Sequence, residues 1–264
     1  MTPAVIRRVE AVAVRGTERH WKLIPPELAT RLRPIVERVG DGLLTLLPKS
    51  NPLRMNRVIG LGHRGLARRA MIDEIIARYR GAGLRRFSFL LSPGPQAAEI
   101  TAWLRERDFE PHGGYTLLIR DARIPVGRPK RVARLRIARA RRGDRLSVVR
   151  IIEECFATPR SRRSWSLAAV GTPGYEHYLA YVGRTSVAVG TLQVEGALAW
   201  LGGARRFRAG DGSARTGRAS REPVGSGSRP TCRSRGQRDA SRRNLVRLGF
   251  EQASLKPSFV WKAR

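Results

Sequence analysis

Glycine-rich segments that follow apolar runs are the first feature of this sequence that could support chemistry. Gly60-Leu61-Gly62-His63-Arg64-Gly65 lies between an apolar run at 58–61 and a helical pattern that begins at Ala67. A glycine-rich turn from a strand into a helix can bind phosphate, because free backbone N–H groups and the helix dipole both favour an anion. The same outline fits an ordinary strand-to-helix loop, so we treat it as an alternative cofactor site.

A second glycine segment, Leu201-Gly202-Gly203-Ala204, closes three apolar runs that are typical of an antiparallel meander. The runs span residues 178–182, 186–194 and 197–202, and turns at Gly183-Arg184 and Glu195-Gly196 join them. Glu195 is the carboxylate nearest the second turn and a conceivable general base, although an exposed turn glutamate needs no catalytic role. We leave the catalytic acid and base unassigned.

The cysteines and histidines do not have the spacing of a metal site. Cys155 and Cys232 are too few for a disulfide framework, and neither has a partner at ligand spacing. The four histidines, His20, His63, His112 and His177, are scattered along the chain. We therefore predict no metal.

The elements of the first half have the order of an α/β unit. Apolar residues at helical spacing predict helices over 67–80 and 99–108, and strands are expected at 58–61, 87–91 and 115–119. Residues 35–47 also have apolar residues at helical spacing, interrupted at Gly40-Asp41-Gly42, and Pro25-Pro26 marks a helix start.

The second half repeats this order after a linker at 122–130 that contains proline and glycine. A strand is expected at 135–138, a helix begins at Asp144, and the meander follows. Both halves also have a Phe-Glu pair before their last expected strand, in Asp108-Phe109-Glu110 and in Gly249-Phe250-Glu251. The repeat predicts two copies of one α/β unit.

The charge is strongly basic, with 52 Lys and Arg against 21 Asp and Glu. Such an excess is typical of nucleic-acid binding, but only five of the 52 are Lys, and a GC-rich coding sequence produces the same bias for Arg. Nucleic acid is therefore an alternative rather than the expected partner. No run approaches the roughly 18 apolar residues of a membrane span, and no signal peptide is evident, so we expect a cytoplasmic protein.

The meander and the segment Ser241–Phe250 together resemble the GNAT N-acetyltransferases. His177-Tyr178-Leu179-Ala180-Tyr181, Val187–Leu192 and Ala199–Ala204 resemble three consecutive strands of that family, and the segment that ends in Gly249-Phe250 resembles its late helix. The resemblance implies tandem domains, each a mixed and mostly antiparallel sheet flanked by helices, with a degenerate copy at 1–124 and an acetyltransferase domain at 131–264.

This resemblance implies that acetyl-CoA is the cosubstrate and that a small-molecule or peptide amine accepts the acetyl group. By position, Leu201, Gly202, Gly203 and Ala204 would supply the strand edge that binds the thioester oxygen, and Asn244 would face the pantetheine arm. Leu245 stands where many relatives have a tyrosine acid. Activity of this particular chain is therefore in question, and a catalytically inactive scaffold is the alternative.

The phosphate loop of the family should follow Ala204, but the sequence continues with residues 205–240, which match no part of it. These 36 residues contain ten Arg, six Gly and five Ser, with Phe207 and Val224 as their only large apolar side chains. Such a composition predicts no regular secondary structure. A shifted reading frame after Ala204 can encode a sequence close to the missing loop, so the segment is either a frame-shifted translation or a native disordered insertion.

Overall fold

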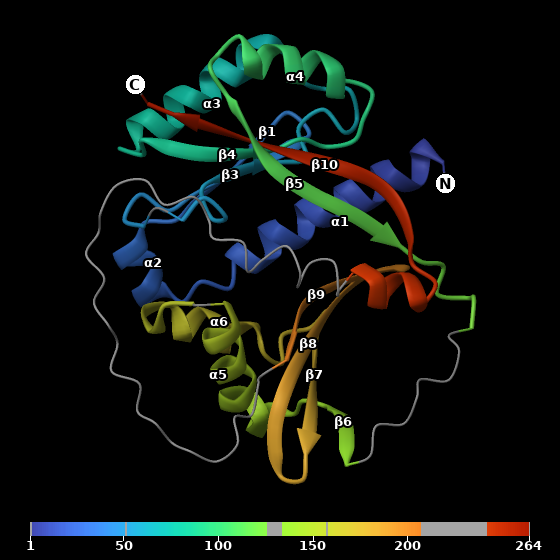
Figure 1. Ribbon diagram of the computed structural model, residues 1–264. Helices are drawn as coiled ribbons and strands as arrows, with labels where there is room; N and C mark the ends of the chain where they lie inside the picture. The colour runs from blue at the N-terminus through green and yellow to red at the C-terminus, as the bar shows by residue number, and fades with distance from the viewer. Residues whose placement is uncertain (1, 51, 126–133, 157, 207–241, 264) are drawn as a thin grey trace.

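The computed structural model describes residues 2–50, 52–125, 134–156, 158–206 and 242–263, which form two β-sheets with helices packed against them (Figure 1). The chain is of the mixed α/β class that the sequence predicted. The elements of the first half are α1 (Pro3–Trp21), α2 (Pro26–Leu32), β1 (Ile35–Val39), β2 (Gly42–Leu46), β3 (Arg57–Ile59), α3 (Arg69–Gly81), β4 (Arg86–Leu90), α4 (Ala97–Arg105) and β5 (Glu110–Ile119). Those that follow are β6 (Leu135–Arg139), η1 (Arg142–Asp144), α5 (Arg145–Phe156), η2 (Arg160–Arg162), α6 (Arg163–Ala169), β7 (Tyr175–Val182), β8 (Thr185–Glu195), β9 (Leu198–Arg206) and β10 (Glu251–Lys262).

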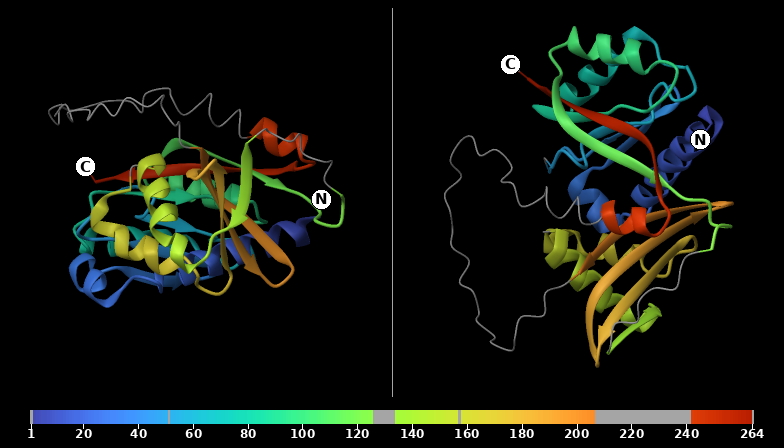
Figure 2. Two further views of the ribbon diagram at one scale, coloured as in Figure 1. Left: turned by 90° about the horizontal axis from the view of Figure 1, so that it is seen from below. Right: turned by 45° about the vertical axis from the view of Figure 1, so that its right-hand side comes forward.

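The first sheet has the strand order β1-β2-β3-β4-β10-β5, in which β3 and β4 are a parallel pair. Apolar side chains of α3 and α4 pack on one face, and α1 packs on the other (Figure 2). Tyr79 of α3 stacks on Phe87 of β4 with ring centroids 3.8 Å apart. Both helices were predicted from their apolar spacing, which places one side chain per turn against the sheet.

The C-terminal strand β10 lies in this first sheet, although the sequence placed it in a domain at 131–264. It pairs antiparallel with both β4 and β5, and its Phe259 and Trp261 are buried in the first-half core. The alternation of apolar side chains identifies the strand, but it carries no information on which of two sheets offers the gap. The remaining boundaries of the two predicted domains stay predictions.

Residues 35–46 form a β-hairpin, so the helical spacing at 35–47 was misleading. Gly40 adopts φ +56° in the turn, and Val39 pairs with Gly42. The β-branched side chains of Ile35 and Val36 favour an extended backbone. β2 contains several leucines because both of its faces are buried, one against α1 and the other against α3.

The second sheet has the order β6-β7-β8-β9 and is antiparallel throughout. α5 packs on it through Val148 and Val149, against Leu179 and Val189. The three strands of the meander were predicted, but β9 continues to Arg206, so residues 205 and 206 are in a strand where the sequence predicted no regular structure. Residues 207–241 lie outside the described part of the chain. Residues 242–247 are helical, as expected.

The two halves meet along α1, which contacts both sheets (Figure 1). Trp165 of α6 enters an apolar cluster with Trp21, Leu28 and Leu47 of the first half, and its Nε1 donates a hydrogen bond to the carbonyl of His20 at 3.0 Å. Within the described residues, no helix is long and apolar enough to cross a membrane.

Candidate functional site

The loop at 60–67 lies where the parallel strands β3 and β4 part. Their pairing ends at Ile59 and Leu90. Beyond that point Leu91 N–H donates to the carbonyl of Pro257 in β10, while the chain after β3 turns away through Gly60 at φ +80°. The glycine loop therefore begins where the two strands part, and it leads into the N-terminus of α3.

Two of the loop glycines are required by close packing. A Cβ at Gly60 would lie 2.2 Å from Val14 Cγ2 of α1, and one at Gly62 would lie 2.3 Å from Ile100 Cδ1 of α4. Both residues also have a positive φ near +80°, which strains any other residue. The loop is thus held tightly between helices on the two faces of the sheet.

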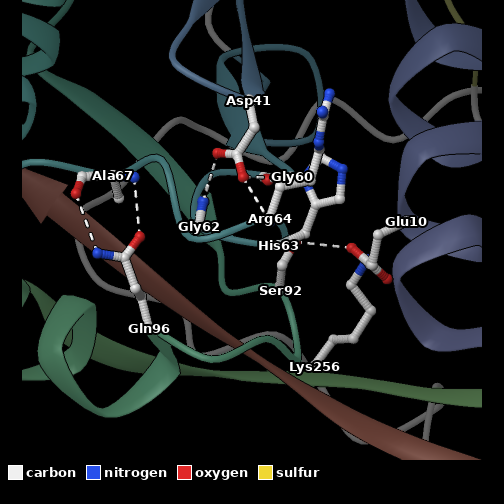
Figure 3. A network of polar contacts seen from close by, with 10 residues as sticks. All are labelled: Glu10, Asp41, Gly60, Gly62, His63, Arg64, Ala67, Ser92, Gln96 and Lys256. Carbon is white, nitrogen blue, oxygen red and sulfur yellow. Dashed lines mark hydrogen bonds and ion pairs between the residues drawn. The ribbon is translucent and has the colours of Figure 1, made fainter. Parts of the chain in front are cut away.

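Asp41, in the turn between β1 and β2, fixes the shape of the loop from inside (Figure 3). Its buried carboxylate accepts hydrogen bonds from Gly62 N–H at 2.7 Å and from Arg64 N–H at 2.6 Å. Two backbone donors that could have faced a bound anion are therefore already occupied.

His63 is held in this network through its Nδ1 atom. Nδ1 lies 2.6 Å from the carbonyl oxygen of Gly60 and 3.4 Å from Asp41 Oδ2. Because a carbonyl can only accept, Nδ1 carries a proton. Nε2 is buried and has no hydrogen-bond partner among the described residues.

Gln96 joins the end of the loop to the start of α4. Its Oε1 accepts from Ala67 N–H at 2.8 Å and its Nε2 donates to the Ala67 carbonyl at 3.0 Å. Outside this clamp, Leu66 is 52% exposed, and Arg64, Arg68 and Arg69 are exposed as well. The N-cap residue Arg68 makes no side-chain cap and the first turn of α3 has no acidic residue, so this end of the helix is positive and faces solvent.

A buried ion pair lies on the α1 side of this loop (Figure 3). Lys256 Nζ of β10 donates to both carboxylate oxygens of Glu10 in α1, at 2.7 Å each, and Ser92 Oγ, just after β4, donates to Glu10 Oε2 at 2.7 Å. The carboxylate thus accepts three hydrogen bonds while almost fully buried. The two chain termini are joined here.

The residues predicted from the second half lie in β9 and the helix at 242–247. Leu201, Gly202, Gly203 and Ala204 belong to β9, which is the last strand of the second sheet within the described residues and pairs with β8, and Leu201 is exposed. Asn244 is exposed on the helix, and no hydrogen bond between described residues links it to β9. The loop that would complete a site there falls within 207–241. The structure therefore leaves these five assignments as predictions.

Glu195, the conceivable base, forms ion pairs with two arginines of α1. Arg15 contacts its Oε1, and Arg19 Nη2 lies 3.4 Å from its Oε2. Its role in the structure is to join the halves. No group of three or more His, Cys, Asp or Glu in the described residues could hold a metal ion.

Sequence reasoning missed the polar residues around the first loop. Glu10 and Lys256 interrupt apolar patterns in α1 and β10, and Asp41 lies between two glycines. A charged residue on an apolar face is a signal for a buried partner. Ser92 and Gln96 carry no comparable signal.

No family model and no curated protein matches this sequence. Solved structures do resemble it. A GCN5-related N-acetyltransferase from Kribbella flavida has a TM-score of 0.53 at 11% identity, with 89% of this chain and 94% of the other covered. One from Sphaerobacter thermophilus has a TM-score of 0.53 at 12% identity, with 100% and 94% covered.

A tandem GNAT protein from the clavulanic acid biosynthesis pathway also has a TM-score of 0.53, at 15% identity, with 90% of this chain and 86% of that chain covered. At such identities the likeness concerns the fold alone. The chain has the fold of the tandem GCN5-related N-acetyltransferases.

Proposed function

We propose that this protein is an N-acetyltransferase that transfers an acetyl group from acetyl-CoA to an amine, and that the loop at 60–67 in the first half holds the cofactor. The observation that carries this proposal is the parting of the parallel pair β3 and β4 at a glycine loop that enters α3. The described strands of the second sheet are all antiparallel, so they contain no parallel pair that parts in this way. The first half therefore takes the role that the sequence assigned to the second.

The residues of the loop fit a pyrophosphate in part. The exposed N-terminus of α3 and the cations of Arg64, Arg68 and Arg69 would neutralise its charge. Arg69 also pairs with Glu106 at 2.8 Å, which holds its guanidinium near the helix start. Acetyl-CoA, when bound, supplies the thioester whose acyl carbon an amine can attack.

His63 is the residue that would remove a proton from the attacking amine. Its Nε2 has no hydrogen-bond partner among the described residues, and the contacts of Nδ1 with Gly60 and Asp41 fix the orientation of the ring. The ring is buried, so the packing around the loop has to open before an acceptor reaches it. The acceptor belongs to the amines, as a small molecule or a peptide.

Calorimetric titration with CoA tests the location of the site through two matched variants. Leu66→Glu places a carboxylate on an exposed position beside the start of α3, and Asn244→Glu places one on the exposed helix of the second half. We expect L66E to weaken binding about tenfold, since a new negative charge near two phosphates costs about 1 kcal/mol or more in water. N244E should bind like the parent chain. The opposite ranking would move the site to the second half.

A non-catalytic scaffold is the second candidate, and the occupation of the loop by Asp41 favours it. The N–H groups of Gly62 and Arg64 already bind a carboxylate, so an external phosphate finds fewer donors. Under this alternative the unmodified chain releases no binding heat with CoA at millimolar concentration. Measurable binding together with acetylation of any amine would exclude it.

A further inference from the structure

A cavity of about 360 Å³ lies between the end of α5 and the segment that leads into α6, in the second half of the protein. The two helices contact each other (Figure 1). The volume is at the lower end of the range of small-molecule sites, which is about 300–1,000 Å³. The lining is polar and charged, and it consists of Arg150, Glu153, Glu154, Thr158, Arg160 and Arg163. None of these residues belongs to the loop at 60–67.

One ion pair of the lining is complete in itself. Arg163, the first residue of α6, donates from Nε to Glu153 Oε1 at 2.9 Å and from Nη2 to Glu153 Oε2 at 2.5 Å. The Glu153 side chain is only 9% exposed, so its carboxylate is already bound by the protein. This pair joins α6 to α5 and fixes one wall of the cavity, while its two charges cancel.

Arg150 and Glu154 are not paired with each other, although they lie one turn apart on α5, where opposite charges normally form an ion pair. Arg150 instead donates from Nη2 to Ser186 Oγ of β8 at 3.2 Å. A neutral hydroxyl does not compensate its charge. Glu154 is exposed and makes no hydrogen bond or ion pair with a described residue. The lining therefore contains a positive and a negative group that the described chain leaves uncompensated.

Arg160, in the 3-10 helix η2, adds a second positive charge. Its side chain is exposed and forms no ion pair with a described residue. The hydrogen bond from Arg163 lowers the pKa of Glu153, and the charge of Arg160 acts in the same direction, as expected for residues that line one cavity. Apart from the complete pair, the lining thus has two positive charges and one negative charge.

We propose that this cavity binds a small amino acid with an acidic side chain, at a site separate from the acetyl-CoA loop. The two carboxylates of such a ligand match Arg150 and Arg160, because a guanidinium donates to pairs of carboxylate oxygens. Its ammonium group matches the carboxylate of Glu154. A polyphosphate does not fit, because Glu154 repels it, and a simple amine lacks groups for the two arginines.

Calorimetric titration with L-glutamate and with glutarate tests the site. Glutarate has the same two carboxylates but no ammonium group, so the two probes isolate the role of Glu154. The parent chain is compared with Glu154→Gln and Arg160→Gln. Glu74→Gln in α3 and Arg184→Gln in the turn between β7 and β8 are the matched controls, since both side chains are exposed and lie outside the cavity.

The parent chain, E74Q and R184Q should bind glutamate with the same affinity. R160Q should bind both probes about tenfold more weakly, and E154Q should bind glutamate about tenfold more weakly, because each variant loses an attraction between opposite charges in contact. E154Q should not weaken glutarate binding. Equal binding of glutamate by all five proteins, losses in the controls as large as in the site variants, or no binding heat in the parent chain would overturn the proposal.

Discussion

Glu10 and Lys256 show how strongly single residues hold this fold together. They lie 246 positions apart in sequence, yet their side chains form a buried ion pair with Ser92 as a third partner. A buried pair adds little stability over apolar residues of similar volume, but breaking it leaves a buried charge alone. The pair therefore makes the joining of α1 and β10 specific.

Lys256→Met should lower the free energy of unfolding by about 3–5 kcal/mol, because it leaves the Glu10 carboxylate buried and unpaired. The double variant E10L/K256M should recover most of this loss. Urea unfolding of the two variants and the parent chain measures both. Ser92→Ala is the control, since it removes one hydrogen bond worth about 1 kcal/mol. A double variant that is no more stable than K256M would show that the pair does not act as a unit.

The stability of the protein should fall in mild acid because of His20. Burial and the nearby Arg57 lower the pKa of this histidine in the folded chain to about 4, against about 6.5 when unfolded. Between these values the unfolded chain binds more protons, so stability falls as the pH drops from about 6.5 to 4. The contribution is about 3 kcal/mol.

Urea unfolding between pH 7 and pH 4 checks this dependence. His20→Phe keeps a ring against Trp165 but cannot be protonated, and it should flatten the profile in this window. His177, whose pKa burial also lowers, accounts for part of the remaining slope. A profile of H20F that is as steep as that of the parent chain would contradict the assignment.

At the scale of single residues, the sequence showed which residues could do chemistry, but it did not show which side chains they contact. The glycines of the 60–65 loop were recognised, but Asp41 was read only as part of an interruption in a helical pattern. The partner of a buried charge lies on another element, and no local pattern reports it. Glu10 and Lys256 are the clearest case.

At the scale of elements, β10 is the strand that completes the first sheet between β4 and β5. Its start pairs with the end of β5, since Glu251 lies opposite Ile119. The two strands are therefore arranged like a hairpin whose connection is the whole second half.

This arrangement predicts that residues 2–120 alone do not fold. The same residues should fold when a short Asn-Gly turn joins them to residues 250–263. The added strand supplies Phe259 and Trp261 to the core. Circular dichroism should show cooperative thermal unfolding of the fusion and none of the fragment. A fusion with F259S and W261S is the control. Cooperative unfolding of the fragment without β10 would refute the role of this strand.

Most elements could be predicted from periodicity, and the exceptions have physical reasons. The helices α3 and α4 have one apolar face each, which a period of 3.6 residues reveals. In β2 both faces are buried, so the alternation that identifies a strand disappears. β10 was recognised as a strand, but its sheet is set by a gap that tertiary structure creates.

At the scale of the whole molecule, the two sheets differ in size and in strand order within the described residues. The first sheet contains six strands, one of them from the C-terminus, and the second contains four within the described residues. β9 pairs on one side with β8. A frame-shifted segment in place of a phosphate loop, a helix and a strand would leave the second half in this state.

Replacing residues 205–240 with the in-frame translation of the gene should restore these elements beside β9. The repaired protein should melt at a higher temperature, because an added strand and helix bury more apolar surface. It should also bind two equivalents of CoA, where the present chain binds one. Calorimetric stoichiometry measures the difference. An unchanged stoichiometry and melting temperature would favour a native insertion.

Hydrogen exchange of the intact chain, with and without saturating acetyl-CoA, tests the central claim most directly because it needs no variant. The account predicts slower exchange in peptides that cover residues 60–72, where the loop meets the first turns of α3, and little change at 198–206 and 242–247. Protection confined to the segments of the second half, or no protection in any peptide, would contradict a cofactor site in the first half.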